Sequence, residues 1–342
     1  MQKLLVIRND KLGDFMLIFP ALCLLKKAMP QLEITALVPS YTAPMAELCP
    51  YIDKIIIDTD HNDKIAIKQL ITHIKEQHFD ASISFFSSWH NAKLTFLSKI
   101  PYRLAPATKI FQYLYNHRLT QRRSQSLKAE FEYNLDLVKY FLQSQNVKIP
   151  AIQPPYLTLS LKQTQQQKQF LAQTLNLDIH KKWIFIHSGS GGSATNLNLQ
   201  QYADLSLALL QQFDCQIILS AGPGESEQAH QLATLISHPK VVIYDKNQGL
   251  QDFTASLACA DLFVSGSTGP LHVSAALNIP TIGFYPSKRS ATPIRWRPIN
   301  DVNSHLAFCP PKGKETEMNL SLISIPDSLS KIIPFIKNIW KI

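Results

Sequence analysis

Short apolar runs alternate along the chain with polar turns and with segments of helical periodicity. The apolar runs predict β-strands at residues 4–7, 33–38, 54–58 and 81–85, and again at 183–187, 215–220, 241–244, 262–265 and 281–284. Helical periodicity predicts helices at 15–27, 63–77, 129–143, 199–212, 226–236, 271–277 and 328–341. Strands that alternate with helices are typical of βαβ units and parallel sheets, so the fold class is α/β.

The pattern stops and restarts near residues 147–155, where Pro150, Pro154 and Pro155 would break any helix. The chain has 342 residues, 45% of them hydrophobic, which is enough for two cores. We therefore predict two Rossmann-like domains, 1–155 and 156–325, followed by a helical segment at 326–342. Ligands of open parallel sheets bind beyond the carboxyl ends of the strands, so both domains should face a central cleft.

The net charge of +9 is unevenly distributed. Residues 81–129 include no acidic residue, and a second acid-free stretch covers 262–300. The first stretch interleaves aromatic residues with eight cations: Lys93, Lys99, Arg103, Lys109, Arg118, Arg122, Arg123 and Lys128. Such a surface fits nucleic acid, an anionic membrane face or a phosphorylated amphiphilic substrate. The apolar run 15–25 is too short to cross a bilayer and has no cleavage pattern, which predicts a cytoplasmic protein.

The polar turn after the first predicted strand, residues 8–14, is the first candidate for chemistry. Asp14 lies where a helix is predicted to begin, and a carboxylate there is favoured by the helix dipole. An ionised carboxylate at the carboxyl edge of a sheet could act as a general base, or it could simply cap the helix. The sequence leaves both interpretations open.

Three turns in the second half are suited to a nucleotide. The Gly/Ser turn 187–195, with Ser190 and Thr195, offers backbone N–H groups to a phosphate or a sugar. Glu225 follows a strand, where a carboxylate either binds ribose hydroxyls or supports a helix N-terminus. The turn 265–272 would form a diphosphate site at a helix N-terminus; its candidate residues are Ser267, Thr268, Gly269, Pro270 and His272. No acidic or histidine cluster has metal-ligand spacing, so we expect no metal and no other cofactor.

Four motifs in order resemble the lipopolysaccharide heptosyltransferase family, glycosyltransferase family 9. They are IRNDKLGDFMLIFPAL at 7–22, EYNLDL at 132–137, GPGE at 222–225 and STGPLHVSAAL at 267–277 with Pro280 after it. The resemblance covers both predicted domains. It implies a GT-B fold and an enzyme that transfers heptose with inversion from ADP-heptose to the lipopolysaccharide inner core or a lipid A precursor.

The resemblance also implies roles for single residues. Asp14 would be the base, Glu225 would hold the ribose, and Thr268, Gly269 and His272 would bind the diphosphate region. The basic stretch would then meet a phosphorylated acceptor, with Lys11, Arg118, Arg122, Arg123 and Lys128 as contacts. We therefore expect a Gram-negative protein at the cytoplasmic face of the inner membrane, in peripheral contact with its anionic surface and binding no nucleic acid. The segment 326–342 would pack back on the first domain.

The sequence departs from the family pattern at three positions. Thr195 stands where a lysine that contacts the donor phosphates is usual, Ser267 where aspartate is frequent, and Ala129 near the place of a usual histidine. Lys11, Lys288, Arg289 or Arg295 could supply the missing charge. Four alternatives therefore remain: another nucleotide sugar, an inactive paralogue, a sugar-nucleotide epimerase, or a nucleotide- or nucleic-acid-binding module.

Overall fold

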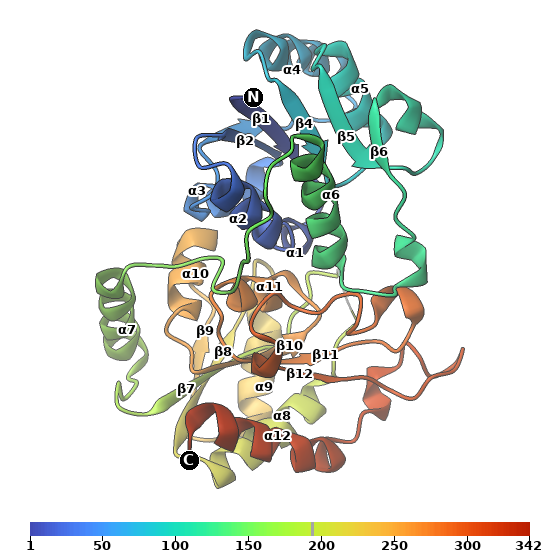
Figure 1. Ribbon diagram of the computed structural model, residues 1–342. Coiled ribbons are helices and arrows are strands. Elements are labelled where there is room, and N and C mark those ends of the chain that lie inside the picture. Colours follow the sequence, from blue (N-terminus) through green and yellow to red (C-terminus); the bar gives the residue numbers. More distant parts are fainter. Residues whose placement is uncertain (193–194) are drawn as a thin grey trace. The chain divides into compact units, whose positions relative to one another are not determined.

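Two compact units make up the chain in the computed structural model, residues Met1–Leu157 and Thr158–Ile342 (Figure 1). The structure describes residues 1–192 and 195–342. The boundary lies two residues from the one predicted at 155/156, in the proline-containing segment between the units.

The first unit is a parallel six-stranded sheet with the strand order β3-β2-β1-β4-β5-β6. Its strands are β1 (Lys3–Ile7), β2 (Glu33–Val38), β3 (Lys54–Ile57), β4 (Ala81–Ser84), β5 (Tyr102–Pro106) and β6 (His117–Leu119). Its helices are α1 (Leu12–Met16), α2 (Phe19–Ala28), α3 (Ala43–Leu48), α4 (Lys64–Glu76), α5 (Trp89–Leu97) and α6 (Glu130–Ser144). The inner strands are apolar on both faces because helices cover both sides of the sheet.

The second unit repeats this plan with the order β12-β11-β10-β7-β8-β9. Its strands are β7 (Lys182–His187), β8 (Cys215–Ser220), β9 (Val241–Tyr244), β10 (Leu262–Gly266), β11 (Thr281–Phe284) and β12 (His305–Phe308). Its helices are α7 (Leu161–Leu175), α8 (Leu199–Gln212), α9 (Ser226–Ile236), α10 (Leu250–Leu257), α11 (Gly269–Ala276) and α12 (Ile325–Trp340). The α/β class and the two-domain architecture are thus confirmed.

The C-terminal helix α12 belongs to the core of the second unit. Ile332 and Ile336 are fully buried in that core, and the helix packs against α8. Trp340 donates from Nε1 to the carbonyl of Asp261 at 3.2 Å and meets the ring of Phe213 edge-on. The apolar stripe of this helix is therefore used within its own unit, and the expected packing of segment 326–342 on the first domain stays a prediction. Within the described ranges, no helix has the length and apolar character needed to cross a membrane.

Helix α6 ends the basic stretch and positions much of the first unit's chemistry. Glu132 accepts a hydrogen bond from the backbone N–H of Ala129 at 2.7 Å, which fixes the start of the helix. Asn134 donates to the carbonyl of Leu17 at 3.1 Å, and α6 packs closely on α2. The helix therefore holds the loop that follows β1 from one side.

Candidate active site

A buried arginine organises the loop after β1. Arg8 is only 3% exposed, although it directly follows the strand. Its Nε donates to Asp10 at 2.8 Å, its second terminal nitrogen to Asp14, and its first to the carbonyl of Phe85 at 3.3 Å. Buried charge is tolerated only when it is paired and hydrogen-bonded, and Arg8 meets both conditions.

The carboxylates around Arg8 outnumber the cations. Arg8 also lies 3.9 Å from Glu130, which is bound in turn by Arg123. Burial lowers the pKa of Arg8, but Asp14, Asp10 and Glu130 outweigh it and raise the pKa overall. Burial raises the pKa of Asp10 to about 6, with Asp14 adding to the rise and Arg8 opposing it. Burial thus makes Asp10 easier to protonate than an exposed aspartate.

Asp14 lies where the sequence predicts it, in the first turn of the five-residue helix α1, with 15% of its side chain exposed. Arg8 holds its Oδ1, whereas Oδ2 accepts no hydrogen bond from any residue that the structure describes. One oxygen is thus fixed and the other is open to a further hydrogen bond.

Arg123 belongs to the same charge network, and its guanidinium has partners within the first unit. Its guanidinium donates to Gln121 at 2.9 and 2.8 Å and to Glu130, and only 15% of its side chain is exposed. The donors of Arg123 thus have internal partners in this structure, and its expected contact with the acceptor stays a prediction.

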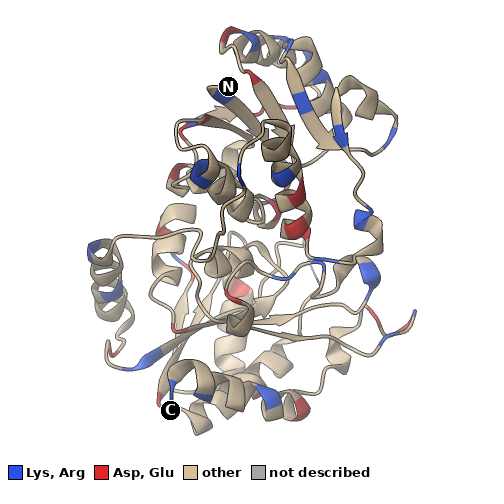
Figure 2. Cartoon of the chain, in the orientation of Figure 1, with Lys and Arg blue, Asp and Glu red and all other residues tan. Residues whose placement is uncertain are grey.

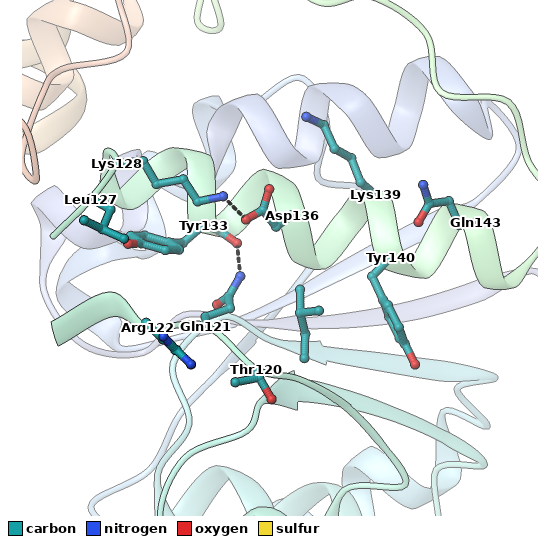
Figure 3. A pocket seen from close by; sticks show the side chains of 11 residues that line it. Thr120, Gln121, Arg122, Leu127, Lys128, Tyr133, Asp136, Lys139, Tyr140 and Gln143 are labelled. Carbon is teal, nitrogen blue, oxygen red and sulfur yellow. Dashed lines mark hydrogen bonds and ion pairs between the residues drawn. The ribbon is translucent and has the colours of Figure 1, made fainter. Parts of the chain in front are cut away.

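A pocket of about 570 Å³ opens beside α6 in the first unit (Figure 3). Residues of the 119–122 segment face residues of α6 across it, and two of the predicted acceptor contacts, Arg122 and Lys128, line it. Lys139, Tyr133 and Tyr140 complete a lining of cations and aromatic rings. Lys128 pairs with Asp136 and lies 5.0 Å from the centre of the Tyr133 ring.

The other two predicted acceptor contacts lie outside this pocket. Arg118 is exposed on β6 with its guanidinium 5.2 Å from the centre of the Tyr113 ring, and Lys11 is exposed just before α1. Figure 2 shows basic segments along β5, β6 and the loop that follows, with acidic residues returning at α6. The acid-free stretch is therefore a surface of the first unit near the pocket.

In the second unit, the three predicted donor turns follow neighbouring strands. The order β10-β7-β8 brings the ends of these strands together at one edge of the sheet. Glu225 reaches from the turn after β8 to the turn after β7, where it accepts from the backbone of Gly191 at 2.6 Å and of Gly222 at 2.9 Å. Its Oε2 also lies 3.3 Å from Nε2 of the buried His187. The structure thus brings Glu225 and the Gly/Ser turn together.

An asparagine that the sequence analysis did not select binds two carbonyl groups of the Gly/Ser turn. Asn196 donates to the carbonyl oxygens of Ser188 at 2.7 Å and Gly189 at 3.2 Å, and its Oδ1 accepts from Tyr202 at 2.5 Å. Ser190 and Thr195 are half-buried on either side of the exposed glycines of the turn. Residues 193 and 194 of the predicted turn lie outside the described residues.

The third donor turn ends β10 and begins α11. Ser267, Gly269 and Pro270 are partly exposed, while Thr268 precedes the helix and is 4% exposed. The Thr268 hydroxyl lies 3.4 Å from that of Ser265. These hydroxyls and the free N–H groups of α11 form a polar, uncharged edge of the kind that receives an anion.

His272 is more deeply placed than its predicted role requires. It is 3% exposed, and burial lowers its pKa to about 4, so the ring is neutral at physiological pH. Its Nδ1 has no hydrogen-bond partner in the part of the chain that the structure describes. His272 is therefore an uncharged hydrogen-bonding group in this structure.

Positive charge is available in the loop after β11. Lys288 and Arg289 are exposed there, and Arg295 stacks 5.5 Å from the ring of Trp296. Because β11 is the neighbour of β10, this loop lies at the same sheet edge as Thr268. Three of the four candidates for the missing lysine charge thus belong to the same unit as the donor turns.

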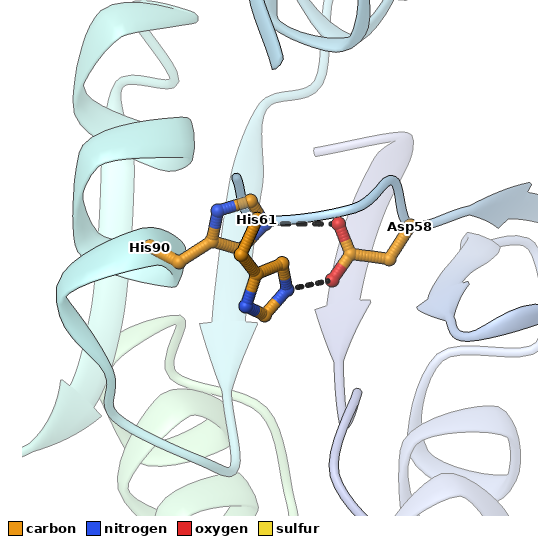
Figure 4. A group of neighbouring side chains, drawn as sticks. All are labelled: Asp58, His61 and His90. Carbon is orange, nitrogen blue, oxygen red and sulfur yellow. Dashed lines mark hydrogen bonds and ion pairs between the residues drawn. The ribbon is translucent and has the colours of Figure 1, made fainter. Parts of the chain in front are cut away.

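A group with metal-ligating atoms lies in the first unit. Among the described residues, Asp58, His61 and His90 bring one ligand atom each within 4.8 Å of one another (Figure 4). Two imidazoles and a carboxylate are a donor set that transition metals accept.

Two units, each a parallel sheet covered by helices, are the architecture of the GT-B class of glycosyltransferases. The family model "Glycosyltransferase family 9 (heptosyltransferase)" matches residues 67–322. A Haemophilus influenzae protein, named as a glycosyltransferase with no stated substrate, is 61% identical over 341 residues, covering 100% of this chain and 99% of its own.

More distant relatives have more specific names. Lipopolysaccharide heptosyltransferase 2 of Salmonella typhimurium is 22% identical over 300 residues, 85% of either chain. The structure of E. coli ADP-heptose lps heptosyltransferase II superposes with a TM-score of 0.77 at 18% identity, covering 98% of this chain and 99% of that one. The chain belongs to glycosyltransferase family 9, which decides against the epimerase and the nucleic-acid-binding module.

Three functional candidates escaped the sequence analysis for identifiable reasons. In the sequence, Arg8 is one of several charged residues between the apolar runs 4–7 and 15–25. A charge at the end of a buried strand needs buried partners, but the sequence does not show which residues they are. Glu130 lies 122 positions further along the chain, so no local pattern links the two. Lys139 belongs to the pocket but lies on α6, beyond the acid-free stretch that drew attention to the other cations.

Proposed function

We propose that this enzyme transfers heptose from ADP-heptose, with inversion, to the inner core of lipopolysaccharide or to a lipid A precursor. The observation that carries the proposal is the Arg8–Asp14 pair, which leaves one carboxylate oxygen open at the edge of a sheet. Family membership supports a glycosyl transfer, and the names of two relatives supply the heptose and the lipopolysaccharide.

In the proposed reaction Asp14 takes the proton from the acceptor hydroxyl. The hydroxyl oxygen then forms a bond to the anomeric carbon while the bond to the diphosphate breaks on the opposite face, which inverts the configuration. General-base assistance is worth about 10²–10⁴ in rate. Arg8 binds and orients Asp14, and Asp10 is the first alternative base because it shares the same arginine.

The second unit would bind the nucleotide. Glu225 would exchange its backbone partners for the ribose hydroxyls, and the turn of Ser267, Thr268, Gly269 and Pro270 would receive the diphosphate. His272 would assist as a neutral donor, and Lys288, Arg289 or Arg295 would supply the charge that Thr195 lacks. Ser190 would contact the sugar or phosphate from the Gly/Ser turn.

The acceptor would bind through the first unit. The pocket beside α6 has three cations, Arg122, Lys128 and Lys139, against the single carboxylate of Asp136. Cations beside aromatic rings suit the phosphates and sugar rings of a phosphorylated glycolipid. Arg118 and Lys11 extend this positive surface. We propose that it also rests against the anionic cytoplasmic face of the inner membrane.

We further propose that transfer needs no divalent metal. The metal-ligating group of the described residues lies in the first unit and not at the diphosphate turns. Helix N-termini and the cations after β11 would stabilise the leaving group instead. Full turnover in excess EDTA is the expected result, and a loss that Mg²⁺ restores would contradict it.

Calorimetric titration with ADP-heptose, using GDP- and UDP-sugars as controls, tests the donor first. Selective binding of ADP-heptose should be followed by transfer to defined lipopolysaccharide acceptors, and Asp14→Asn should abolish turnover while the donor Kd stays within about threefold. Preference for another nucleotide sugar would refute the heptose assignment. Donor binding without any transfer would support the inactive paralogue, and near-normal turnover of Asp14→Asn would move the base to Asp10.

A further inference from the structure

Asp58 is a buried carboxylate at the carboxyl end of β3 that no step above uses. Its side chain is 3% exposed, yet both oxygens have partners. Oδ1 accepts from His90 at 2.9 Å and from the backbone of Thr59 at 2.9 Å, and Oδ2 lies 3.0 Å from Nε2 of His61. Figure 4 shows the two imidazoles facing the two oxygens of the one carboxylate.

The same carboxylate reaches the loop after β1 through Asn9. The Nδ2 of Asn9 donates to Oδ2 of Asp58 at 2.5 Å and to Oδ1 of Asn91 at 2.8 Å. The amide of the fully buried Asn91 donates back to Asn9 at 2.9 Å and also to the carbonyl of Phe86 at 2.8 Å. Asn9 is therefore held through both its donor and its acceptor.

These contacts join the loops that follow β1, β3 and β4. His90 and Asn91 lie in the first turn of α5, whose start is fixed by Ser88 accepting from the N–H of Asn91 at 3.1 Å. Arg8 and Asn9 are consecutive, so one residue of the loop is anchored to Asp10 and Asp14 and the next to Asp58. A shift of the loop would break both sets of bonds.

A bound metal ion is a poorer interpretation of the same cluster. The oxygens of Asp58 already accept from four nitrogen donors, which is about the number that a carboxylate can take. The imidazole rings of His61 and His90 stack with centres 3.7 Å apart. Two rings that share a tetrahedral ion diverge from it, so a cation would require both histidines to move.

We propose that Asp58, which is hydrogen-bonded to His61 and His90, is a positioning residue that holds the loop after β1, residues 8–14, in place through Asn9. The inference rests on the proposed function of Asp14. A displacement of about 1 Å in a reacting group can cost about 10²-fold in rate. Asp58 binds Asn9, the residue next to Arg8, so loss of this bond should lower turnover.

A double-mutant cycle tests the route through Asn9. Asp58→Asn and Asn9→Ala should each lower kcat about 10–100-fold with the KM for the donor sugar nucleotide changed by less than about threefold. The double variant should be no more than about threefold slower than the slower single variant, since both remove one link. A double variant whose loss equals the product of the single losses would overturn the proposal.

Asp80→Asn is the matched control. Asp80 accepts from the backbone of Gln2 at 2.6 Å and Lys3 at 3.0 Å, so it anchors the opposite end of β1. The Asp80→Asn substitution should lower the free energy of unfolding without lowering kcat. A fall in kcat for Asp80→Asn as large as that for Asp58→Asn would reduce the effect to general destabilisation and overturn the proposal.

Hydrogen exchange separates this inference from the proposed function, because it needs no substrate. Deuterium uptake of the peptide 8–15 should accelerate about tenfold or more in Asp58→Asn and stay at the wild-type rate in Asp80→Asn. Unchanged uptake in Asp58→Asn would overturn the proposal, as would one equivalent of zinc bound by the wild type and lost with Asp58. If no donor supports transfer but the uptake changes as expected, the function fails and the anchoring stands.

Discussion

Gly189 gives the sharpest test of the donor half-site, because its missing side chain makes room for Glu225. A Cβ at Gly189 would lie far inside van der Waals contact with the Glu225 carboxyl group. The φ angle of Gly189 is outside the left-handed region, so alanine suits the backbone, and the nearest atoms that a Cβ would meet all belong to Glu225. Gly189→Ala should therefore expel the carboxylate without unfolding the unit.

The size of the effect follows from the bonds that Glu225 would lose. It accepts from Gly191 at 2.6 Å and from Gly222 at 2.9 Å, and hydrogen bonds to a charged group are worth about 1.5–3 kcal/mol each. Because 13% of the side chain is exposed, the expelled carboxylate regains water. We expect a net loss of about 2 kcal/mol in stability and, through the misplaced ribose contact, ADP binding about 10–100-fold weaker.

The assay is calorimetric ADP binding and thermal unfolding for Gly189→Ala, Glu225→Ala and the double variant. If the clash with Glu225 is the whole effect, Gly189→Ala should cost almost nothing once Glu225 is alanine. Equal costs in both backgrounds would refute the reasoning, as would a Gly189→Ala protein with wild-type ADP affinity.

Three further perturbations have defined outcomes. Because burial lowers the pKa of His272 from 6.5 to about 4, this residue binds more protons in the unfolded chain between these values; it should contribute a fall of about 1.4 kcal/mol per pH unit to the unfolding free energy as the pH is lowered, and His272→Gln should reduce the slope by about that amount in urea titrations at pH 4.5–7. Ile336→Ala leaves a cavity beneath α12 and should cost about 2–5 kcal/mol in the same titrations, whereas a cost below about 1 would mean that the helix is not packed as described. Arg122→Gln with Lys139→Gln should raise the acceptor KM more than tenfold and leave ADP affinity unchanged; an unchanged acceptor KM would place the acceptor elsewhere.

The sequence predicted the strands of both sheets best where they are buried on both faces. The runs at β2, β8 and β11 agree residue for residue, because a short apolar run bounded by turns is typical of a strand in a parallel sheet. Strands β5 and β6 were missed: Tyr102–Pro106 begins with partly exposed polar residues and His117–Leu119 is three residues long. Helix α7 was missed because Leu171 is its single fully inward residue in a glutamine-rich segment.

The sequence predicted which turns carry the candidate site residues, but it did not predict the hydrogen-bond partners of those residues. Asp14, Glu225 and Thr268 lie at strand ends, where chain order alone places them at the carboxyl edges. The bonds that define their state, Arg8 to Asp14 and Gly191 to Glu225, depend on three-dimensional neighbours. A charge block in sequence likewise does not reveal that one of its cations, Arg123, pairs with the carboxylate of Glu130.

The common strand order of the two sheets has a consequence for how such an enzyme could change its chemistry. In both units the first strand lies between the second and the fourth, so the loops after β1 and β7 occupy equivalent places, as do those after β4 and β10. One copy of the plan carries arginine and aspartate there, and the other carries glycine, serine and threonine. The same two loop positions therefore occur once in each unit. Substitutions in the loops of the first unit can change the proposed proton transfer, and substitutions in the loops of the second unit can separately change the proposed nucleotide binding.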